Sequence, residues 1–543
     1  MTKPRTLSFA SIGFWGVIII VILLAFPGIN REITFYDEGV YLVIAKALAS
    51  GLGYVRESLP NSPSETLFPP LLPLSLSLVW HFFPNFPDNL VIMRILMLVA
   101  GVLFLAVSYR YLYLKDGLDH GDIEALSIVA MVGLHPFFVD FTTRLSGEMP
   151  YALLSMVGLY FYARFTSDNK PLHLGFAISF AALAVMTRTI GIALFGALVI
   201  HLLLMRRFRL SIAAAACGGV VFLAWQLWSL AAQGGYSGYP LEIALNYRGH
   251  IVDFVLADWI VQLPRSLPIN LLSLIINWAF FIFPWVPRII LFVLGILFIA
   301  LGIGGLIVAV VIYPFFRNFS QQLRIHDLYC MLSLLLILIW PWPQNSRFLL
   351  VISPFLISYF FRGLRFLMSR GLIKHLSEET ARMATNIVIA IVVSGALVHN
   401  FTAARNYRQT AQRMFPVYTE FHRMLNWIKD TTPANSIVVG NYDPAYHLYT
   451  GRKSIRLSFP DPFSIYYTKE VAREFPRAGR LLEWVRQLKA CYLVDDPMSA
   501  GREHLFYRNL IQAIKRVSPG SLSPIYVGGN GLFVVYKVSG CPE

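Results

Sequence analysis

The sequence is poor in charged side chains and in cysteine. Charged residues make up 14% of its 543 residues, whereas hydrophobic residues make up 56%, and a soluble chain of this length would be more polar. The four cysteines include no Cys-x-x-Cys pair, so the usual pattern of a structural zinc site is absent. The low content of charged residues argues against a soluble enzyme, and the cysteine pattern argues against a zinc-binding module. The long apolar runs indicate a protein that crosses a membrane several times.

Acidic residues are also scarce, since 45 lysines and arginines outnumber 30 aspartates and glutamates and give a net charge of +15. The basic residues lie in short clusters between apolar runs, of which Arg206-Arg207-Phe208-Arg209 is the densest. Such clusters are typical of cytoplasmic loops, where the positive-inside rule places them. We therefore predict no nucleic-acid partner and use the clusters to orient the chain.

The first apolar run, Phe9 to Pro27, carries no charge and can cross a hydrocarbon core of about 30 Å as a helix. Only Lys3 and Arg5 precede it, and no Ala-x-Ala cleavage site closes it, so we predict a retained span with a cytoplasmic N-terminus. Basic clusters then alternate with further apolar runs, which predicts about eleven spans. The predicted spans are 9–27, 90–113, 123–141, 151–161, 172–186, 190–205, 210–230, 289–316, 328–340, 348–361 and 387–398.

The C-terminal part has a different composition, and an odd number of crossings places it outside the membrane. Its predicted strands are 436–440, 491–494 and 532–536, and its predicted helices are 421–428, 481–489 and 503–516. The predicted fold is a polytopic α-helical membrane protein, with a transmembrane domain over residues 1–399 and an extracytoplasmic α/β domain over residues 400–543. Cys491 and Cys541 fit either a disulfide or two free thiols.

The first outer loop, residues 29–89, contains Phe35-Tyr36-Asp37-Glu38-Gly39, two adjacent carboxylates directly after the first span. Apolar residues from Val40 to Leu48 recur at helical spacing and predict an amphipathic helix on the membrane surface, with Asp37 at the edge of the apolar stripe and Glu38 nearly opposite. The segment from Leu71 to Phe83 has three prolines at its start, Pro69, Pro70 and Pro73, and predicts a short surface-inserted helix. A third interfacial helix is predicted from Ile269 to Phe283.

Several motifs occur in an order that resembles the membrane-embedded GT-C glycosyltransferases, especially the bacterial aminoarabinose transferase and protein O-mannosyltransferase group. The motifs are Asp37-Glu38 after the first span, Gly51-Leu52-Gly53-Tyr54, Phe68-Pro69-Pro70-Leu71, Arg144-Leu145-Ser146-Gly147-Glu148, Gln344-Asn345-Ser346-Arg347-Phe348 to Pro354, and Thr450-Gly451-Arg452. The aminoarabinose enzymes have a basic residue where this chain has Phe68, so a phosphate contact implied there would have to come from elsewhere.

The resemblance implies an inverting glycosyltransferase that moves a sugar from a polyprenyl-phosphate carrier to an extracytoplasmic lipid, glycan or protein acceptor. Asp37 would be the general base that takes the proton of the acceptor. Glu38 would orient Asp37 or bind the acceptor, and Glu148 would approach from the adjoining span. The alternative is that an Asp at a helix start caps the helix and complements its dipole.

The leaving phosphate requires positive charge, for which arginine is suited. The predicted phosphate ligands are Arg347, Arg144, Arg248 and Arg188, which lie on the side of the membrane that the positive-inside rule tends to deplete of basic residues. Pairing with nearby carboxylates or lipid headgroups for structure alone is the other interpretation of each arginine.

Three tyrosines, Tyr41, Tyr54 and Tyr247, are predicted acceptor or sugar contacts, although aromatic residues of outer loops also serve as interfacial anchors. His250, near Asp253 and Asp258, could help to bind a divalent metal, and a solvated histidine is the simpler interpretation. No cofactor follows with certainty from the sequence.

Two other functions fit a polytopic protein: a transporter or flippase of lipid-linked sugars, and a noncatalytic membrane scaffold. The sequence shows no obvious duplicated halves and few charges within its spans, which argues against a transporter. We predict a multi-pass enzyme of the plasma (inner) membrane.

Overall fold

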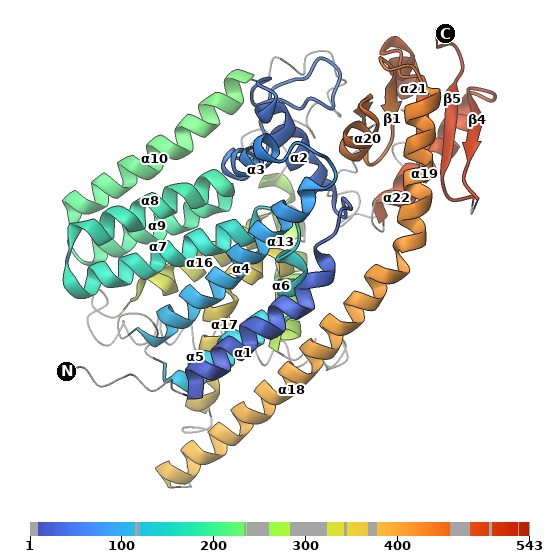
Figure 1. Ribbon diagram of the computed structural model, residues 1–543. Coiled ribbons are helices and arrows are strands. Elements are labelled where there is room, and N and C mark those ends of the chain that lie inside the picture. Colours follow the sequence, from blue (N-terminus) through green and yellow to red (C-terminus); the bar gives the residue numbers. More distant parts are fainter. Residues whose placement is uncertain are drawn as a thin grey trace. The chain divides into compact units, whose positions relative to one another are not determined.

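The computed structural model describes residues 9–114, 118, 120–232, 235, 260–282, 323–340, 345–367, 377–456, 478–498, 502–529 and 531–541. The chain forms two compact units (Figure 1). The helical unit consists of Met1–Asn30, Met93–Trp225 and Ser266–Gln409, and the mixed unit of Arg31–Ile92, Gln226–Arg265 and Thr410–Glu543. The predicted domains assigned the first outer loop to the transmembrane part, whereas the loop groups here with the C-terminal residues.

The helical unit packs long apolar helices around one hydrophobic core. Its helices are α1 (Phe9–Ala25), α4 (Asn89–Tyr113), α5 (Asp122–Gly133), α6 (Pro136–Phe141), α7 (Glu148–Asp168), α8 (Pro171–Thr187), α9 (Ile192–Leu204), α10 (Phe208–Ala231), α13 (Ile260–Ile282), α16 (Ile325–Ile339), α17 (Asn345–Leu367) and α18 (Glu378–Arg413), with the short 3₁₀ turns η1 (Phe26–Gly28) and η2 (Thr189–Gly191). Helices α7, α8 and α9 lie side by side (Figure 1).

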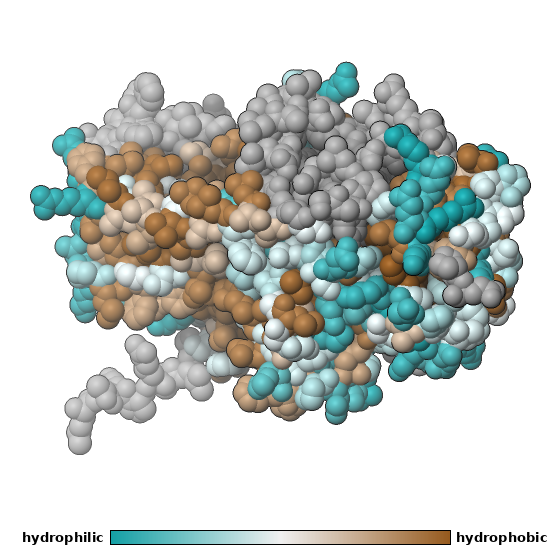
Figure 2. All heavy atoms as spheres, turned by 90° about the horizontal axis from the view of Figure 1, so that it is seen from above, coloured by the Kyte–Doolittle hydropathy of each residue, from teal (hydrophilic) through white to brown (hydrophobic). Residues whose placement is uncertain are grey.

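Five helices of the described residues are long and apolar enough to cross a membrane: Ala10–Gly28, Asn89–Tyr113, Phe208–Ala231, Arg347–Arg365 and Arg382–Asn406. Figure 2 shows apolar side chains over a broad surface of the helical part, as expected for contact with lipid, and mostly hydrophilic side chains over the α/β part. The membrane character is therefore confirmed. The number of eleven spans stays a prediction.

Several predicted spans differ from the helices observed. The span predicted over 123–141 is broken into α5 and α6 before Pro136, because proline has no N–H and favours an extended residue before it; His135 has φ −64° and ψ 132°. Helix α7 is longer than the predicted 151–161, and α18 extends far beyond the predicted 387–398 to 36 residues. The predicted span 289–316 lies outside the described residues.

The mixed unit contains a five-stranded sheet in the order β2-β1-β3-β5-β4. Its strands are β1 (Ile437–Val439), β2 (Lys453–Ile455), β3 (Tyr492–Asp495), β4 (Leu522–Val527) and β5 (Val534–Val538), and its helices are α19 (Phe415–Thr431), α20 (Asp443–Thr450), α21 (Ala478–Gln487) and α22 (Arg502–Val517). Strands β1, β2 and β3 are parallel, and β5 and β4 are antiparallel to their neighbours. The three predicted strands and three predicted helices are all present.

The first outer loop completes this unit by packing on the sheet. Leu59 is fully buried in the same apolar cluster as Val439 and Ile455, and the N–H of Ser454 donates to the carbonyl of Ser58 at 2.8 Å. Because β2 is an edge strand, this hydrogen bond covers part of a backbone edge that would otherwise be exposed.

The loop contains α2 (Tyr36–Ala49) and α3 (Leu71–Phe82), close to the predicted bounds. The prediction that α2 is an amphipathic surface helix is wrong. Residues from Glu38 to Ala45 are all buried, because α2 packs between α3 and α20 within the unit. A helix with apolar residues on nearly all of its sides is expected to be buried on nearly all of its sides, as α2 is.

Cys491 and Cys541 are free thiols in the structure. Burial, and then the neighbouring Cys491 thiol, raise the pKa of Cys541 to about 12. A thiol with so high a pKa is a poor nucleophile at neutral pH.

A buried acid lies directly after β3. The hydroxyl of Tyr446 donates to Oδ2 of Asp496, and the N–H of Met498 donates to Oδ1 at 2.8 Å. Burial outweighs these two hydrogen bonds and raises the pKa of Asp496 to about 6, from an ordinary value of 3.8. The ionised form is thus favoured less in the folded protein than in the unfolded chain.

We expect Asp496→Asn to stabilise the mixed unit at pH 7.5 by about 1 to 3 kcal/mol, because it removes a buried charge while the amide oxygen still accepts from the Met498 N–H and the amide NH2 group can donate to the Tyr446 oxygen. The native acid costs no stability below about pH 3.8 and costs progressively more as the pH rises to about 6. The gain in thermal unfolding temperature should therefore disappear towards pH 4. A variant that is destabilised equally at every pH would contradict this assignment.

Candidate functional site

Glu148 is the buried centre of a charged cluster in the helical unit. It is the first residue of α7, where a negative charge complements the helix dipole. Its Oε1 pairs with Nη1 of Arg188 and with Nε of Arg347. The side chain of Glu148 is 1% exposed, whereas those of Arg188 and Arg347 are 17% and 12% exposed. The arginines therefore present part of their surface beyond the carboxylate that they share.

The two arginines come from distant parts of the chain. Arg188 is an extended residue between α8 and η2, and Arg347 lies in the first turn of α17. Gly191 permits the tight return after Arg188, because a Cβ there would lie 2.7 Å from the backbone carbon of Ala184. The structure thus brings together three of the predicted site residues.

The cluster and the ion pair beside it contain three guanidinium groups and two carboxylates. Arg188 and Arg347 share the carboxylate of Glu148, and Arg144 and Asp140 form the neighbouring ion pair at 2.7 Å. Guanidinium groups held close together are suited to an anion that can accept several hydrogen bonds, such as a phosphate. Arg144, the fourth predicted residue of this region, therefore lies beside the cluster with a carboxylate partner of its own.

Aromatic rings support the guanidinium groups. The Cζ of Arg188 lies 5.1 Å from the ring centroid of Phe348, and the Cζ atoms of Arg144 and Arg347 lie 5.3 Å and 6.0 Å from that of Phe141. Contacts of this kind attract the cation to the face of the ring and exclude water from one side of it. They fix the arginines without neutralising them.

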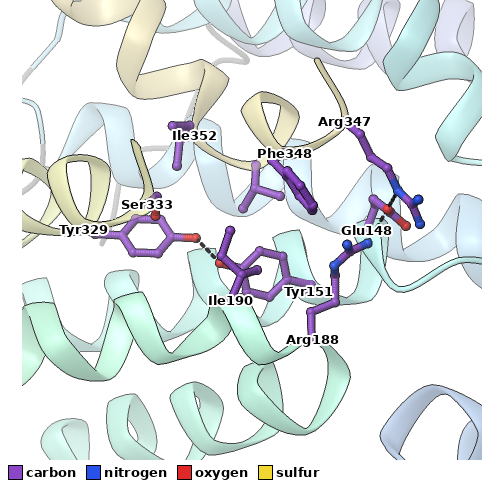
Figure 3. A pocket seen from close by; sticks show the side chains of 10 residues that line it. Glu148, Tyr151, Arg188, Ile190, Tyr329, Ser333, Arg347, Phe348 and Ile352 are labelled. Atoms are coloured by element: carbon purple, nitrogen blue, oxygen red, sulfur yellow. Dashed lines mark hydrogen bonds and ion pairs between the residues drawn. The ribbon is translucent and has the colours of Figure 1, made fainter. Parts of the chain in front are cut away.

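A small cavity adjoins the cluster (Figure 3). Glu148, Arg188 and Arg347 lie at one end, and the hydroxyls of Tyr151 and Tyr329 meet at 2.9 Å at the other. The cavity has room for about one water molecule. A lipid phosphate therefore would not fit within it, and the partly exposed faces of the arginines are the available contact.

Asp37 and Glu38 belong to the mixed unit, in the first turn of α2. Asp37 is half-buried. Glu38 is fully buried, and its Oε2 accepts hydrogen bonds from the N–H and the hydroxyl of Thr34 at 2.8 Å and 3.1 Å. These bonds close the turn that carries Asp37, so Glu38 has the contacts of an orienting residue. The prediction that Glu38 points to the polar side of the helix is wrong, because α2 has almost no such side.

Two predicted sugar or acceptor contacts lie around Phe68. The ring of Tyr41 is buried and packs edge-on against that of Phe68, with centroids 4.8 Å apart. The hydroxyl of Tyr54 donates to the Phe68 carbonyl at 2.6 Å. Both tyrosines thus support the loop, and a role in binding the acceptor stays a prediction.

A guanidinium group lies next to Phe68, at the position where the resemblance implied a basic residue. The Cζ of Arg56 is 5.8 Å from the Phe68 ring centroid. Arg56 is buried in an ion pair with Glu65, so it has a structural partner for its charge.

Arg248, Tyr247 and His250 lie outside the described residues. Within the described residues, no three histidine, cysteine, aspartate or glutamate side chains lie close enough to hold a metal ion. The predicted divalent metal therefore stays untested at His250.

The sequence did not single out several residues that complete these sites. Asp140 and Phe141 end α6 and lie within four residues of Arg144, Tyr36 directly precedes Asp37, and Asp443 lies far away in the chain. The first three are near a predicted residue in the sequence, and that proximity was the available signal. Asp443 gave no signal, because its partner Tyr36 is about four hundred residues away.

Neither a protein-family model nor a curated protein sequence matches this chain. Solved structures do match. ArnT from Cupriavidus metallidurans in the apo state has a TM-score of 0.54 at 13% identity, covering 98% of this chain and 99% of ArnT. The same enzyme bound to undecaprenyl phosphate has a TM-score of 0.51 at 12% identity, covering 97% and 98%. The archaeal oligosaccharyltransferase AglB from Archaeoglobus fulgidus, in complex with an inhibitory peptide and a dolichol-phosphate, has a TM-score of 0.54 at 12% identity, covering 97% and 74%.

The chain has a GT-C fold. The resemblance predicted from the order of its motifs is thereby confirmed at the level of the fold. At 12 to 13% identity the similarity does not carry over individual residues, so the roles of Asp37, Glu148 and the arginines depend on the geometry described above and on experiment.

Glu148→Gln should destabilise this protein by about 3 to 5 kcal/mol, because it leaves two largely buried guanidinium groups close together without the anion that they share. The measurement is thermal unfolding in detergent, followed by tryptophan fluorescence.

The second substitution Arg188→Gln in the same chain should recover part of the loss, since it removes one of the two repelling charges. If the double variant is less stable than Glu148→Gln alone by the full cost of Arg188→Gln, Glu148 and Arg188 are not coupled in the folded protein.

Proposed function

We propose that this protein is an inverting glycosyltransferase that moves a sugar from a polyprenyl-phosphate carrier to an extracytoplasmic lipid, glycan or protein acceptor. The observation that carries the proposal is the convergence of Arg188 and Arg347 on Glu148, located in a chain with a GT-C fold over nearly its whole length. ArnT of this fold has been solved with undecaprenyl phosphate, and AglB with a dolichol-phosphate.

The chemistry requires a base at the acceptor and positive charge at the leaving group. Asp37 takes the proton of the acceptor nucleophile while that nucleophile attacks the anomeric carbon. The bond between this carbon and the phosphate oxygen breaks from the opposite side, so the configuration inverts and the lipid phosphate leaves with the electron pair. Arg347 and Arg188, with Arg144 and Arg248 as further ligands, stabilise the charge that develops on the phosphate.

Glu148 has a defined part in this scheme. Its Oε1 fixes both arginines, and its Oε2 accepts no hydrogen bond among the described residues. Oε2 of Glu148 can therefore accept a hydrogen bond from a hydroxyl of the bound sugar. Arginines fixed in advance need little reorganisation when the phosphate gains charge, which is the main advantage of a preorganised site.

The location follows from the same scheme. A carrier with a polyprenyl chain stays in the bilayer, so the site must open at the membrane boundary. We place the protein in the plasma (inner) membrane, with its N-terminus in the cytoplasm and the α/β part on the outer side, where the acceptor is found.

Asp37→Asn should reduce transfer by about 100-fold or more, because the amide cannot take a proton. The assay uses protein reconstituted in liposomes with a panel of radiolabelled polyprenyl-phosphate sugars, and follows label into lipid, glycan and protein fractions. Asp88→Asn is the matched control, since Asp88 lies in the same loop, is well exposed and pairs with Arg31 at 3.0 Å. Undiminished transfer by Asp37→Asn would remove Asp37 as the base.

Arg347→Gln should raise the KM for the donor by about 10-fold, since a charged hydrogen bond to phosphate contributes about 1.5 to 3 kcal/mol. Undecaprenyl phosphate should compete with the donor in the native protein and compete less well in the variant. Arg365→Gln is the control, because Arg365 also forms an ion pair with a glutamate, Glu124, at 2.9 Å in the same unit. Equal effects of the two substitutions would mean that Arg347 has no specific contact with the phosphate.

A further inference from the structure

The turn that carries Asp37 is fixed by contacts from outside α2. The first N–H groups of a helix have no partner within it, so the first turn is its least constrained part. Glu38 closes this turn onto Thr34, and the hydroxyl of Tyr442 donates to the carbonyl of Ile33 at 3.1 Å, just before the turn. The first contact is local, whereas the second joins the turn to the α/β part of the same unit.

Tyr36, the residue before Asp37, makes the most direct link. Its hydroxyl donates to Oδ1 of Asp443, the first residue of α20, at 2.9 Å. Asp443 is 1% exposed. Burial, and then the negative charge of Asp443, raise the pKa of Tyr36 well above its usual range. The Tyr36 hydroxyl therefore keeps its proton and remains a donor to this carboxylate.

An arginine lies over the ring of the same tyrosine. The Cζ of Arg456 is 5.0 Å from the Tyr36 ring centroid, and its Nε donates to Oδ1 of Asn441 at 2.7 Å. Arg456 directly follows β2, and Asn441 follows β1 by two residues. Both groups thus stand at the carboxyl ends of parallel strands, the most rigid support that the unit offers.

The backbones of α2 and α20 also approach closely. A Cβ on Gly39 would lie 2.8 Å from Cβ of Pro444, which is too close for any side chain at that position without movement of the helices. At the other end of α2, Nζ of Lys46 lies 3.5 Å from Nε2 of His447 and 3.5 Å from Oε2 of Glu57. Helix α2 is therefore fixed to α20 near both of its ends.

We propose that Tyr36, Asp443 and Arg456 are positioning residues: they connect the α/β sheet to the first turn of α2 and hold Asp37 where the acceptor is deprotonated. This inference rests on the proposed function, and it assigns to the α/β part a role in catalysis in addition to any binding of partners. A displacement of about 1 Å at a reacting group can reduce a rate by about 100-fold, so a single hydrogen bond at this point affects turnover.

The test is a comparison of kcat and KM in the liposome transfer assay. Tyr36→Phe keeps the ring under Arg456 and removes only the hydroxyl, and it should lower kcat by about 10- to 100-fold with both KM values within about 3-fold of the native ones. Asp443→Ala should match it. Asp443→Asn retains an oxygen acceptor for Tyr36 and should recover most of the rate. The pair Tyr36→Phe and Asp443→Ala together should be no slower than either alone.

A matched control separates position from stability. Tyr446→Phe also removes a hydroxyl from a buried tyrosine–aspartate hydrogen bond of this unit, the one to Asp496. It should lower the unfolding temperature at least as much as Tyr36→Phe does and leave kcat within about 2-fold. If the two variants lose kcat in proportion to their lost stability, or if Tyr36→Phe keeps the native kcat, the positioning role is wrong.

Hydrogen–deuterium exchange tests the same link without any activity measurement. Tyr36→Phe and Asp443→Ala should increase exchange at the amides of residues 37–41, and Tyr446→Phe should not. Faster exchange together with no transfer of any panel sugar by the native protein would retain the structural link and overturn the proposed function. Faster exchange together with undiminished transfer by Asp37→Asn would remove Asp37 as the base, and the positioning role with it. Native exchange and native kcat in Tyr36→Phe, with transfer lost in Asp37→Asn, would overturn the positioning role and leave the proposed function intact.

Discussion

The packing of α2 on α20 is the contact on which the candidate base depends. Two features of the sequence make it possible: Gly39, which has no Cβ to separate the helices, and an apolar surface that continues around most of α2. The contact brings Tyr36 within hydrogen-bonding distance of Asp443. Without it, an acidic first turn at the start of a short helix would be exposed to water and free to fray.

Two further contacts join the first outer loop to the mixed unit. Leu59 enters the core of the sheet, and Ser58 pairs with the edge strand β2. The loop thereby protects a strand edge, and the sheet in turn gives the loop a rigid surface. Each part supplies apolar surface that the other buries, so neither is expected to keep this conformation alone.

The charged cluster of the helical unit contributes geometry more than stability. A buried carboxylate between two arginines contributes little net stability once the cost of desolvation is counted, and it is costly to break. Its advantage is geometric, because Glu148 holds both guanidinium groups near one point while their outer faces stay partly exposed. Phe141 and Phe348 restrict them further without reducing their charge. This arrangement suits a group that gains negative charge during a reaction.

Local pattern was sufficient for most of the secondary structure. The apolar runs that became α1, α4, α8, α9 and α10 were predicted within a few residues, as were β1, β3 and β5, because helical and strand periodicity are properties of neighbouring residues. The break before Pro136 was missed although proline gives a local signal, since an apolar run of the expected length concealed it. Glu148, Arg188 and Arg347 were named as site residues from the order of motifs and the scarcity of outer charges.

The sequence by itself determined that this is a membrane protein with a charged outer loop and a separate α/β region, because hydropathy and charge are additive along the chain. Only the tertiary structure decided that α2 is buried, that Tyr36 meets Asp443, and that two arginines share one glutamate. Those contacts join residues forty to four hundred positions apart, and no local periodicity encodes which distant side chain will fill a given place in a packed core.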